Sequence, residues 1–359
     1  MLNDPGGNGS PRHDRILVVL PNWVGDVVLA TAALRALREH HPDAHITYLL
    51  KPYVQELIGG CGWVDDVLCW PRGGRLSAML RLVAALRRGR FTHAVLMTNS
   101  FRSALVTATA RIPHRLGYDR DGRGFLLTDR LVAPRREGKF LPVSMTSYYN
   151  ALVSYLGCPV SSRLELATDP VDDDELNTRL AARARVGGGP RVVLNPGAAF
   201  GSAKCWLPER FAEVGQRLID TQDADVVICC GPSEADVAGA ISRRIEGPHT
   251  LLDDPVVSLR LLKSLIRGSD LLVTNDSGPR HIAVAFDVPV VTIFGPTAPG
   301  WTETGYTRER KVLVPVECGP CMLRTCPLDH RCMKLVTADM VVEASAALLP
   351  AGSQERVRS

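Results

Sequence analysis

Residues 15–40 read RILVVLPNWVGDVVLATAALRALREH, and this stretch decides the fold. Its first six residues, Arg15–Leu20, form a continuous apolar run, as expected of a strand that is buried on both faces of a sheet. From Asp26 to His40 the apolar residues recur three or four positions apart, which is the spacing of an amphipathic helix. A strand, a tight turn and a helix in this order predict the first unit of a parallel, doubly wound α/β sheet.

The same alternation continues along the chain. It predicts further strands at His45–Leu50, Val64–Trp70, Ala94–Thr98, Arg191–Asn195, Asp225–Cys230, Thr250–Leu252, Leu271–Asn275 and Val288–Phe294. It predicts helices at Tyr53–Ile58, Arg75–Arg88, Phe101–Arg111, Tyr148–Leu156, Pro208–Asp220, Ser233–Ile245, Val257–Arg267, Pro279–Phe286 and Ala338–Leu349. Two such series predict two doubly wound domains in tandem, with a ligand in the cleft between them.

Breaks in the alternation set the expected domain boundaries. Residues 1–14 are polar and rich in Gly and Pro, so we expect a disordered tail that is no secretory signal. Residues 15–170 form the expected N-terminal domain, which contains an irregular basic excursion at Asp119–Ser147. An acidic start and a Gly-Gly-Gly-Pro end mark residues 171–190 as the linker. Residues 191–335 form the expected C-terminal domain, and residues 336–359 a closing helix and tail.

Composition narrows the class of protein. The chain has 359 residues with 42 Lys+Arg and 38 Asp+Glu, a net charge of +4 that is too small to predict a nucleic-acid partner. No apolar run approaches the roughly 20 residues that a membrane-spanning helix needs. Ten cysteines without a secretory signal favour a reducing cytoplasm over a disulfide framework.

The turn after the first strand, Pro21–Asp26, carries the first candidate site residue. Asp26 has two interpretations: an N-cap for the helix that follows, or a general base at the floor of the cleft. The turn lacks the Gly-x-Gly-x-x-Gly pattern, so a nicotinamide cofactor is not expected.

In the second half, the loop Asn195–Pro208 is rich in small residues that let a backbone approach a phosphate, and Lys204 can supply a compact positive charge. The plain alternative is a surface loop with a solvated lysine. Glu234 follows the next strand and can accept hydrogen bonds from ribose hydroxyls, or it can be a favourable charge in a helix's first turn.

The segment Thr274–His281 has the character of an anion site. Gly278 precedes a helix whose N–H groups would point at a phosphate, with Ser277 and His281 as further donors. Alternatively, Asp276 or Ser277 caps the helix and His281 is a satisfied helix residue. The segment Phe294–Thr297 ends the last expected strand and can close the same pocket.

Two further clusters have open interpretations. The arginines of the basic excursion are solvated surface, or they bind the phosphates and carboxylates of an anionic glycolipid. Peripheral attachment to the inner leaflet of a membrane would follow. The cysteines at Cys318, Cys321, Cys326 and Cys332 are free thiols, a redox-labile disulfide or a structural metal site; their spacing matches neither a zinc ribbon nor a ferredoxin.

Taken together, the motifs resemble a known family. They are Asn22-Trp23-Val24-Gly25-Asp26, Asn195-Pro196-Gly197 with Lys204-x-Trp206-x-Pro208, Asn275-Asp276-Ser277-Gly278-Pro279-x-His281, and Phe294-Gly295-Pro296-Thr297. In order and spacing they look like the ADP-heptose:lipopolysaccharide heptosyltransferases of glycosyltransferase family 9. The Trp-Val-Gly-Asp wording and the cysteine-rich tail look like the heptosyltransferase II branch.

The resemblance implies a GT-B fold, an inverting mechanism, and neither a metal nor a cofactor. It implies ADP-L-glycero-D-manno-heptose as donor and the heptosyl-Kdo inner core on lipid A as acceptor. It makes Asp26 the catalytic base and implies a donor site formed by Asn195, Gly197, Lys204, Glu234, Asp276, Ser277, Gly278 and His281. To the acceptor we assign Asn22, Trp23, Arg120, Arg123, Arg135 and Arg136.

The sequence departs from the family in two places. Arg280 stands where Met is common, which places an extra charge beside the donor site, and Ala198-Ala199-Phe200 lacks the hydroxyl residues that some members use on phosphates. Three alternatives therefore stay open: a transferase for another nucleotide sugar, a nucleotide-sugar epimerase, and a two-domain solute-binding protein. The last is disfavoured by the missing signal and the ten cysteines.

Overall fold

The computed structural model describes residues 14–73, 76–181 and 188–349. Almost all of the expected tail at 1–14, Arg75, part of the expected linker and the last ten residues lie outside these ranges. The chain divides into two compact units. Unit 1 comprises the chain up to Glu165 together with Gly300–Thr304, and unit 2 comprises Leu166–Pro299 and the chain from Gly305 onward.

Unit 1 contains a six-stranded sheet in the order β3-β2-β1-β4-β5-β6, with every neighbouring pair parallel. Its strands are β1 (Arg15–Val19), β2 (His45–Leu50), β3 (Asp66–Cys69), β4 (His93–Leu96), β5 (His114–Tyr118) and β6 (Asp129–Leu131). Its helices are α1 (Val24–His40), α2 (Pro52–Ile58), α3 (Leu76–Gly89), α4 (Phe101–Thr109) and α5 (Met145–Tyr155), with a 3-10 turn at Gly124–Leu126.

Unit 2 repeats the plan in the order β11-β10-β9-β12-β13-β14, again with every neighbouring pair parallel. Its strands are β9 (Arg191–Asn195), β10 (Asp225–Cys229), β11 (His249–Leu252), β12 (Leu271–Asn275), β13 (Val290–Ile293) and β14 (Glu309–Val312). Its helices are α6 (Pro170–Ala181), α7 (Pro208–Gln222), α8 (Ala235–Ser242), α9 (Leu259–Arg267), α10 (Gly278–Ala285), α11 (Arg331–Lys334) and α12 (Ala338–Ala346), with 3-10 turns at Ser202–Lys204 and Pro299–Thr302.

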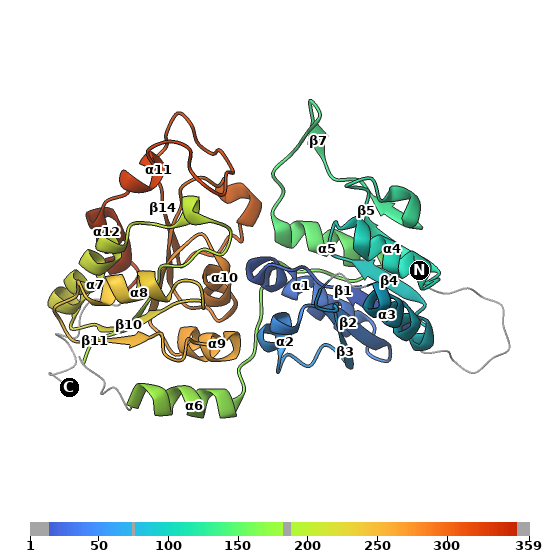
Figure 1. Ribbon diagram of the computed structural model, residues 1–359, viewed down its shortest axis with the longest axis horizontal. Coiled ribbons are helices and arrows are strands. Elements are labelled where there is room, and N and C mark those ends of the chain that lie inside the picture. The colour runs from blue at the N-terminus through green and yellow to red at the C-terminus, as the bar shows by residue number, and fades with distance from the viewer. Residues whose placement is uncertain (1–13, 74–75, 182–187, 350–359) are drawn as a thin grey trace. The chain divides into compact units, whose positions relative to one another are not determined.

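The two sheets confirm the predicted fold class of two doubly wound α/β domains (Figure 1). The central strands explain why it could be predicted: residues 16–19 of β1 and 192–194 of β9 are fully buried, as a sheet covered on both faces requires. Three strands were missed, namely β5, β6 and β14. Each carries charged residues, such as Glu309-Arg310-Lys311 in β14, and so does not resemble a buried strand.

Two irregular regions turn out to be structured. The expected linker at 171–190 includes most of α6, which packs on α9 and is held there by ion pairs from Arg260 to Asp172 and Glu175. The basic excursion contains β6 and then a two-stranded hairpin, β7 (Arg135–Arg136) and β8 (Lys139–Phe140). Glu137 and Gly138 both have positive φ, 51° and 76°, which is the backbone of a type I′ hairpin turn.

Within the described ranges, none of the helices has both the length and the apolar character needed to cross a membrane.

Candidate active site

Each sheet has a topological switch point, where the connections from two adjacent strands leave in opposite directions. It lies between β1 and β4 in unit 1 and between β9 and β12 in unit 2. In doubly wound sheets, ligands bind at the carboxyl ends of the strands beside such a point. The turn before Asp26 follows β1, the Lys204 loop follows β9, and the Asp276 turn follows β12. The fold therefore brings the predicted residues of each unit to the edge of its sheet where binding is expected.

Asp26 lies in the first turn of α1 but does not cap it. The helix begins at Val24 with Trp23 as its N-cap residue, so the N-cap interpretation of Asp26 is wrong. The helix dipole favours a carboxylate at this position. Asp26 is partly buried and influences Tyr149 of α5: burial first, and then the negative charge of Asp26, raise the pKa of that phenol. The carboxylate thus lies near a neutral hydroxyl.

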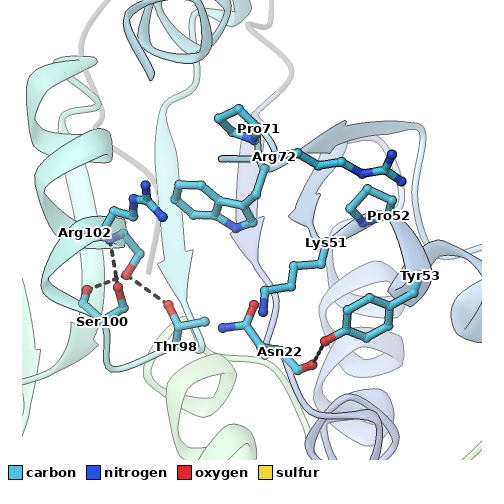
Figure 2. A pocket seen from close by; sticks show the side chains of 11 residues that line it. Asn22, Lys51, Pro52, Tyr53, Pro71, Arg72, Thr98, Ser100 and Arg102 are labelled. Atoms are coloured by element: carbon cyan, nitrogen blue, oxygen red, sulfur yellow. Dashed lines mark hydrogen bonds between the residues drawn. The ribbon is translucent and has the colours of Figure 1, made fainter. Parts of the chain in front are cut away.

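A cavity of about 500 Å³ opens at the same edge of unit 1. It is lined by residues that follow four different strands: Asn22, Lys51, Pro52, Tyr53, Trp70, Pro71, Arg72, Thr98, Ser100, Arg102 and Ser103. Figure 2 shows Asn22, Lys51 and Tyr53 on one side of the pocket and Thr98, Ser100 and Arg102 on the other. Of the predicted acceptor residues, only Asn22 lines it.

Three cations line this pocket, and our sequence reasoning missed all of them. Lys51, Arg72 and Arg102 are exposed, and within the described ranges no carboxylate forms an ion pair with any of them. The pocket therefore presents uncompensated positive charge to a ligand. A signal was available, since Lys51 directly follows β2 and Arg102 lies at the start of α4 just after β4, at the strand ends where ligands bind.

Arg123 corrects one prediction for the basic excursion. Its side chain is fully buried, with 0% exposed. The guanidinium donates to the carbonyls of Tyr118, Thr98 and Ser100 and to the amide oxygen of Asn99. An acceptor cannot reach it, because every direction is occupied by the protein. Arg123 instead fixes the loop after β4 that lines the pocket.

Two of the other predicted arginines of the excursion pack on the same aromatic ring. Arg120 and Arg135 both pack on Phe140, with guanidinium carbons 3.9 and 4.1 Å from the ring centre. Arg135 and Arg136 are exposed on the hairpin, which projects from the body of unit 1 (Figure 1). The structure brings Arg120 and Arg135 together but includes neither in the lining of the cavity.

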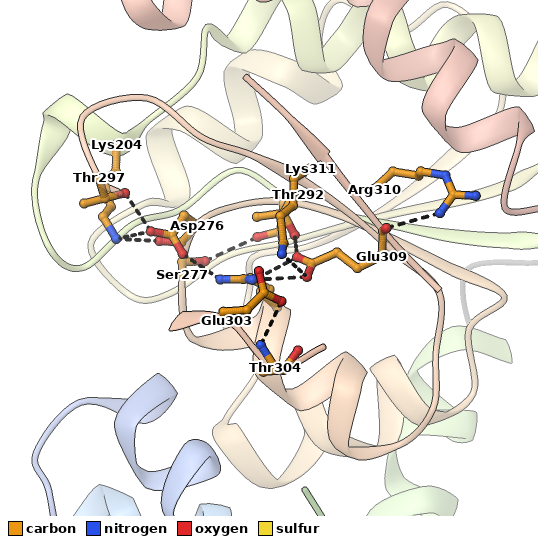
Figure 3. A network of polar contacts seen from close by, with 12 residues as sticks. Lys204, Asp276, Ser277, Thr292, Thr297, Glu303, Thr304, Glu309, Arg310 and Lys311 are labelled. Atoms are coloured by element: carbon orange, nitrogen blue, oxygen red, sulfur yellow. Dashed lines mark hydrogen bonds and ion pairs between the residues drawn. The ribbon is translucent and has the colours of Figure 1, made fainter. Parts of the chain in front are cut away.

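In unit 2, Lys204 and Asp276 form the centre of the predicted donor site. The ammonium nitrogen of Lys204 lies 2.6 Å from Oδ2 of Asp276 and 2.9 Å from its backbone carbonyl. Thr297 donates to the same carboxylate oxygen at 2.7 Å. Figure 3 shows Lys204 and Thr297 converging on Asp276. Asp276 is only 4% exposed, so it positions Lys204 rather than presenting its own charge to a ligand.

Arg280 extends this network into the core. Its guanidinium lies 3.2 Å from Asp276 on one side and donates twice to Glu309 of β14, at 2.6 and 3.1 Å. Arg280 is fully buried and Glu309 nearly so. The expected extra charge beside the donor site is therefore neutralised inside the protein. Burial alone would raise the pKa of Asp276, but the charges of Lys204 and Arg280 outweigh burial and lower it.

Gly197 and Glu234 meet at the end of β9. A Cβ atom at position 197 would lie 1.9 Å from Oε2 of Glu234, so any other residue here would displace that carboxylate. That oxygen also accepts the backbone N–H of Gly231 at 2.9 Å. The carboxylate thus joins the loop after β10 to the loop after β9, and the partly exposed Glu234 stays at the edge where a ribose was predicted.

Two buried side chains hold the Lys204 loop in place. Asn275 accepts the backbone N–H of Trp206 at 3.0 Å and donates to the carbonyl of Pro196 at 2.5 Å. The indole N–H of Trp206, itself 1% exposed, donates to the carbonyl of Val336 at 3.1 Å. Asn195, predicted to bind the donor, is buried and donates to the carbonyl of Cys229. Its side chain therefore positions two strand ends.

The start of α10 has the form predicted for an anion site. The helix begins at Gly278 with Ser277 as its N-cap residue, and the Ser277 side chain makes no capping bond to the backbone. His281 is 3% exposed, and its Nδ1 has no partner among the described residues. Burial, followed by the charge of Arg280, lowers its pKa to about 3, so this imidazole is neutral at pH 7.

All ten cysteines are free thiols in the structure. Cys318, Cys321 and Cys326 lie close enough to Cys332 to affect its titration: burial raises the pKa of Cys332 and these thiols add to the shift. Within the described ranges, however, no three of these four sulfur atoms come together as a metal-binding set.

Comparison with known proteins identifies the family. A profile of "Glycosyltransferase family 9 (heptosyltransferase)" matches residues 79–331. Lipopolysaccharide heptosyltransferase 2 of Salmonella typhimurium is 28% identical over 328 residues, covering 83% of this chain and 90% of that protein. Lipooligosaccharide heptosyltransferase 2 of Haemophilus influenzae is 27% identical, covering 80% and 85%.

Among solved structures, ADP-heptose LPS heptosyltransferase II of E. coli matches with a TM-score of 0.78 at 26% identity, covering 93% of this chain and 98% of that one. The family profile spans well over half of the chain, and the two parallel sheets match the GT-B architecture of that structure. The chain therefore belongs to glycosyltransferase family 9.

Proposed function

We propose that this glycosyltransferase moves L-glycero-D-manno-heptose from ADP-heptose to the heptosyl-Kdo inner core of lipid A. The observation that best supports this proposal is the Lys204–Asp276 pair, which lies beside the start of α10 at the switch point of the second sheet. The relatives named above are heptosyltransferases of lipopolysaccharide and lipooligosaccharide, which supports the choice of substrates.

In this proposal, unit 2 binds the donor. Charge develops on ADP as the sugar departs, and preorganised positive groups stabilise it. Lys204, fixed by Asp276, and the N–H groups at Gly278 supply this stabilisation without a divalent ion. Ser277 and the neutral His281 stand beside them as further donors, and Glu234 accepts the ribose hydroxyls across Gly197.

In the same proposal, unit 1 binds the acceptor and provides the catalytic base. Asp26 removes the proton from the attacking hydroxyl, which gives inversion in a single displacement. Its place in the first turn of α1 and its partial burial support this role. The pocket beside it offers Lys51, Arg72 and Arg102 to the carboxylates and phosphates of the acceptor, with Trp70 and Tyr53 as apolar walls for sugar rings.

An apolar surface on unit 1 supports the proposal that the enzyme works at the cytoplasmic face of the inner membrane. Leu76 and Leu80 of α3 are 73% and 58% exposed, and Phe101 of α4 and Phe125 are 43% and 74% exposed. The rings of Phe101 and Phe125 lie 6.1 Å apart, and α3 packs on α4. Apolar side chains flanked by the arginines of α3 suit an anionic lipid surface.

The deciding experiment is mass spectrometry of the products formed with a panel of nucleotide sugars and heptosyl-Kdo2-lipid A. We expect one heptose to be added from ADP-heptose, with an inverted anomeric centre and in the presence of excess EDTA. Transfer only from another nucleotide sugar would refute the proposed donor. Activity that EDTA abolishes and Mg²⁺ or Mn²⁺ restores would refute the metal-free mechanism.

A further inference from the structure

Two histidines and a cysteine meet where α1 and α5 end. His40 is the last residue of α1 and His41 is its C-cap residue. Cys158 follows α5 by three residues, and α1 and α5 pack against each other in unit 1. One ring nitrogen of each histidine and the Cys158 sulfur all lie within 4.8 Å of one another.

The backbone explains how Cys158 reaches this place. After α5, the N–H of Gly157 donates to Ser154 and the N–H of Cys158 donates to Val153, the two bonds of a Schellman motif. Gly157 has φ 87°, a conformation that favours glycine. The chain therefore reverses at Gly157 and returns Cys158 to the α1 terminus. Nε2 of His40 lies 3.6 Å from where a Cβ of residue 157 would be.

One ring nitrogen in this cluster is buried without a hydrogen bond to any described residue. Nε2 of His41 is buried and has no hydrogen-bond partner among the described residues. A buried polar atom without a partner costs stability, and such an atom calls for an explanation such as an ion. The backbone of His41 bonds to Leu37 and Ala44, and its ring packs edge-on against the His40 ring, with 4.8 Å between ring centres.

We propose that His40, His41 and Cys158 form a zinc site that no part of the transfer reaction uses. Two imidazoles and a thiolate are the donor set that Zn²⁺ prefers, and three protein ligands leave one position for water. Zn–N and Zn–S distances of about 2.1 and 2.3 Å require donors about 3.5 Å apart. Zinc binding requires the donor atoms, which lie within 4.8 Å of one another, to move closer, and the exposed His40 side chain can turn.

The surrounding charges favour a cation here. The carboxyl ends of α1 and α5 both carry negative helix dipoles. The carboxylate of Asp14 adds a negative charge near His41.

The site lies at the opposite end of α1 from Asp26. Seventeen helical residues at about 1.5 Å each separate the two ends by more than 20 Å. Zinc here ties the end of α1 to the end of α5 and stabilises unit 1 without contacting the reacting groups. Its detection therefore does not depend on the proposed substrates.

The test is metal titration of the full chain in competition with a chromophoric chelator, using Zn²⁺ for affinity and Co²⁺ for its thiolate charge-transfer band. The parent carries Cys318→Ser and Cys321→Ser, which removes the exposed cysteines near the C-terminus. Two variants probe the site, His40→Gln and Cys158→Ser. Two matched controls lie outside it, His114→Gln and Cys61→Ser.

We expect one tight zinc per parent chain and a loss of affinity of about 100-fold or more in both site variants, the upper end of what even outer-shell partners cost. The Co²⁺–thiolate band disappears only in Cys158→Ser, and both controls bind as the parent does. If Cys158→Ser fails to fold, His40→Gln decides, since residue 40 is exposed. No tight zinc in the parent, or equal affinity in His40→Gln, overturns the proposal.

Discussion

The two units present the same sheet edge with opposite electrostatics. At the edge of unit 1, Lys51, Arg72 and Arg102 are exposed around a cavity that contains no carboxylate. At the edge of unit 2, Lys204 is partly buried, Arg280 is fully buried, and each is paired with an acid. The first arrangement leaves charge available to any anion that enters. The second fixes the charges in advance, as expected where one group must be stabilised in one geometry.

The largest effect we expect comes from Asp26→Asn, which removes the proposed base but keeps its shape. Turnover should fall by about 10²- to 10⁴-fold, the contribution typical of general-base catalysis. ADP affinity should stay unchanged, because the proposed donor-binding residues belong to unit 2. Steady-state kinetics together with ADP calorimetry measure both. A folded variant with near-normal turnover would leave Asp26 with only a dipole role at the start of α1.

The next effect tests whether unit 2 depends on internal pairing. Glu309→Gln removes the nearer of the two carboxylates that pair with the buried Arg280, and breaking a buried ion pair costs about 3–5 kcal/mol. Denaturant unfolding should show this loss. Replacing both partners, with Arg280→Met and Glu309→Leu, should recover most of it, since the unpaired charge is then gone. Equal destabilisation in the single and double variants would mean that packing, not charge, is the cause.

Lys204→Ala should weaken ADP binding by about 10- to 100-fold, the range for a hydrogen bond to a charged group. The matched control is Lys263→Met, because Lys263 is a buried lysine of unit 2 that donates to the carbonyl of Ala167 and lies outside the proposed site. Calorimetry on both variants separates loss of the donor site from general damage to unit 2. Unchanged ADP affinity in Lys204→Ala would move the donor site elsewhere.

Protonation of His281 gives a pH dependence with a defined sign. Its pKa is about 3 in the fold against an ordinary value of 6.5, so below pH 6.5 the unfolded chain binds a proton that the folded chain does not. Stability therefore falls as the pH drops from 6.5 towards 3, by up to about 1.4 kcal/mol per pH unit. His281→Asn should lower the slope of unfolding free energy against pH by the amount that the uptake of one proton contributes. Comparison at pH 8 gives the cost of the substitution itself, and an unchanged slope would contradict the assignment.

The smallest effect concerns the open edge of unit 1. Lys51→Ala with Arg102→Ala should raise the acceptor KM by about 3- to 10-fold at low salt and less at higher salt, because exposed charges are screened over about 8 Å at physiological ionic strength. The donor KM should not change. Arg243→Ala with Arg244→Ala, exposed on unit 2, is the charge-matched control. The double variant Arg135→Ala with Arg136→Ala, on the hairpin, decides whether the acceptor uses the pocket or the hairpin.

The same contrast explains what the sequence could and could not predict. The apolar strands and the glycine turns of both units are recognisable from short stretches of sequence. The two sheets, and the positions of Asp26 and Lys204 after their strands, could therefore be predicted from the sequence. Strand β14 could not, because its Glu309 looks like a surface charge until Arg280, 29 residues earlier, is known to face it. The prediction for Arg123 was wrong for the same reason, because its hydrogen-bond partners include carbonyls of the loop after β4. Pairing between distant residues is not encoded in any short window.

The bond from Trp206 to Val336 has a consequence for the order in which the protein matures on the ribosome. Domains generally fold in sequence as they emerge, and the strands and helices of unit 1 are complete once residue 165 has left the exit tunnel, apart from the short segment 300–304. The indole of Trp206, in the Lys204 loop, bonds to the carbonyl of Val336, which lies 130 residues later in the chain. This bond can therefore form only after those residues have been synthesised. Nascent chains stalled shortly before residue 336 should already contain the folded first sheet but lack the bond that anchors the Lys204 loop.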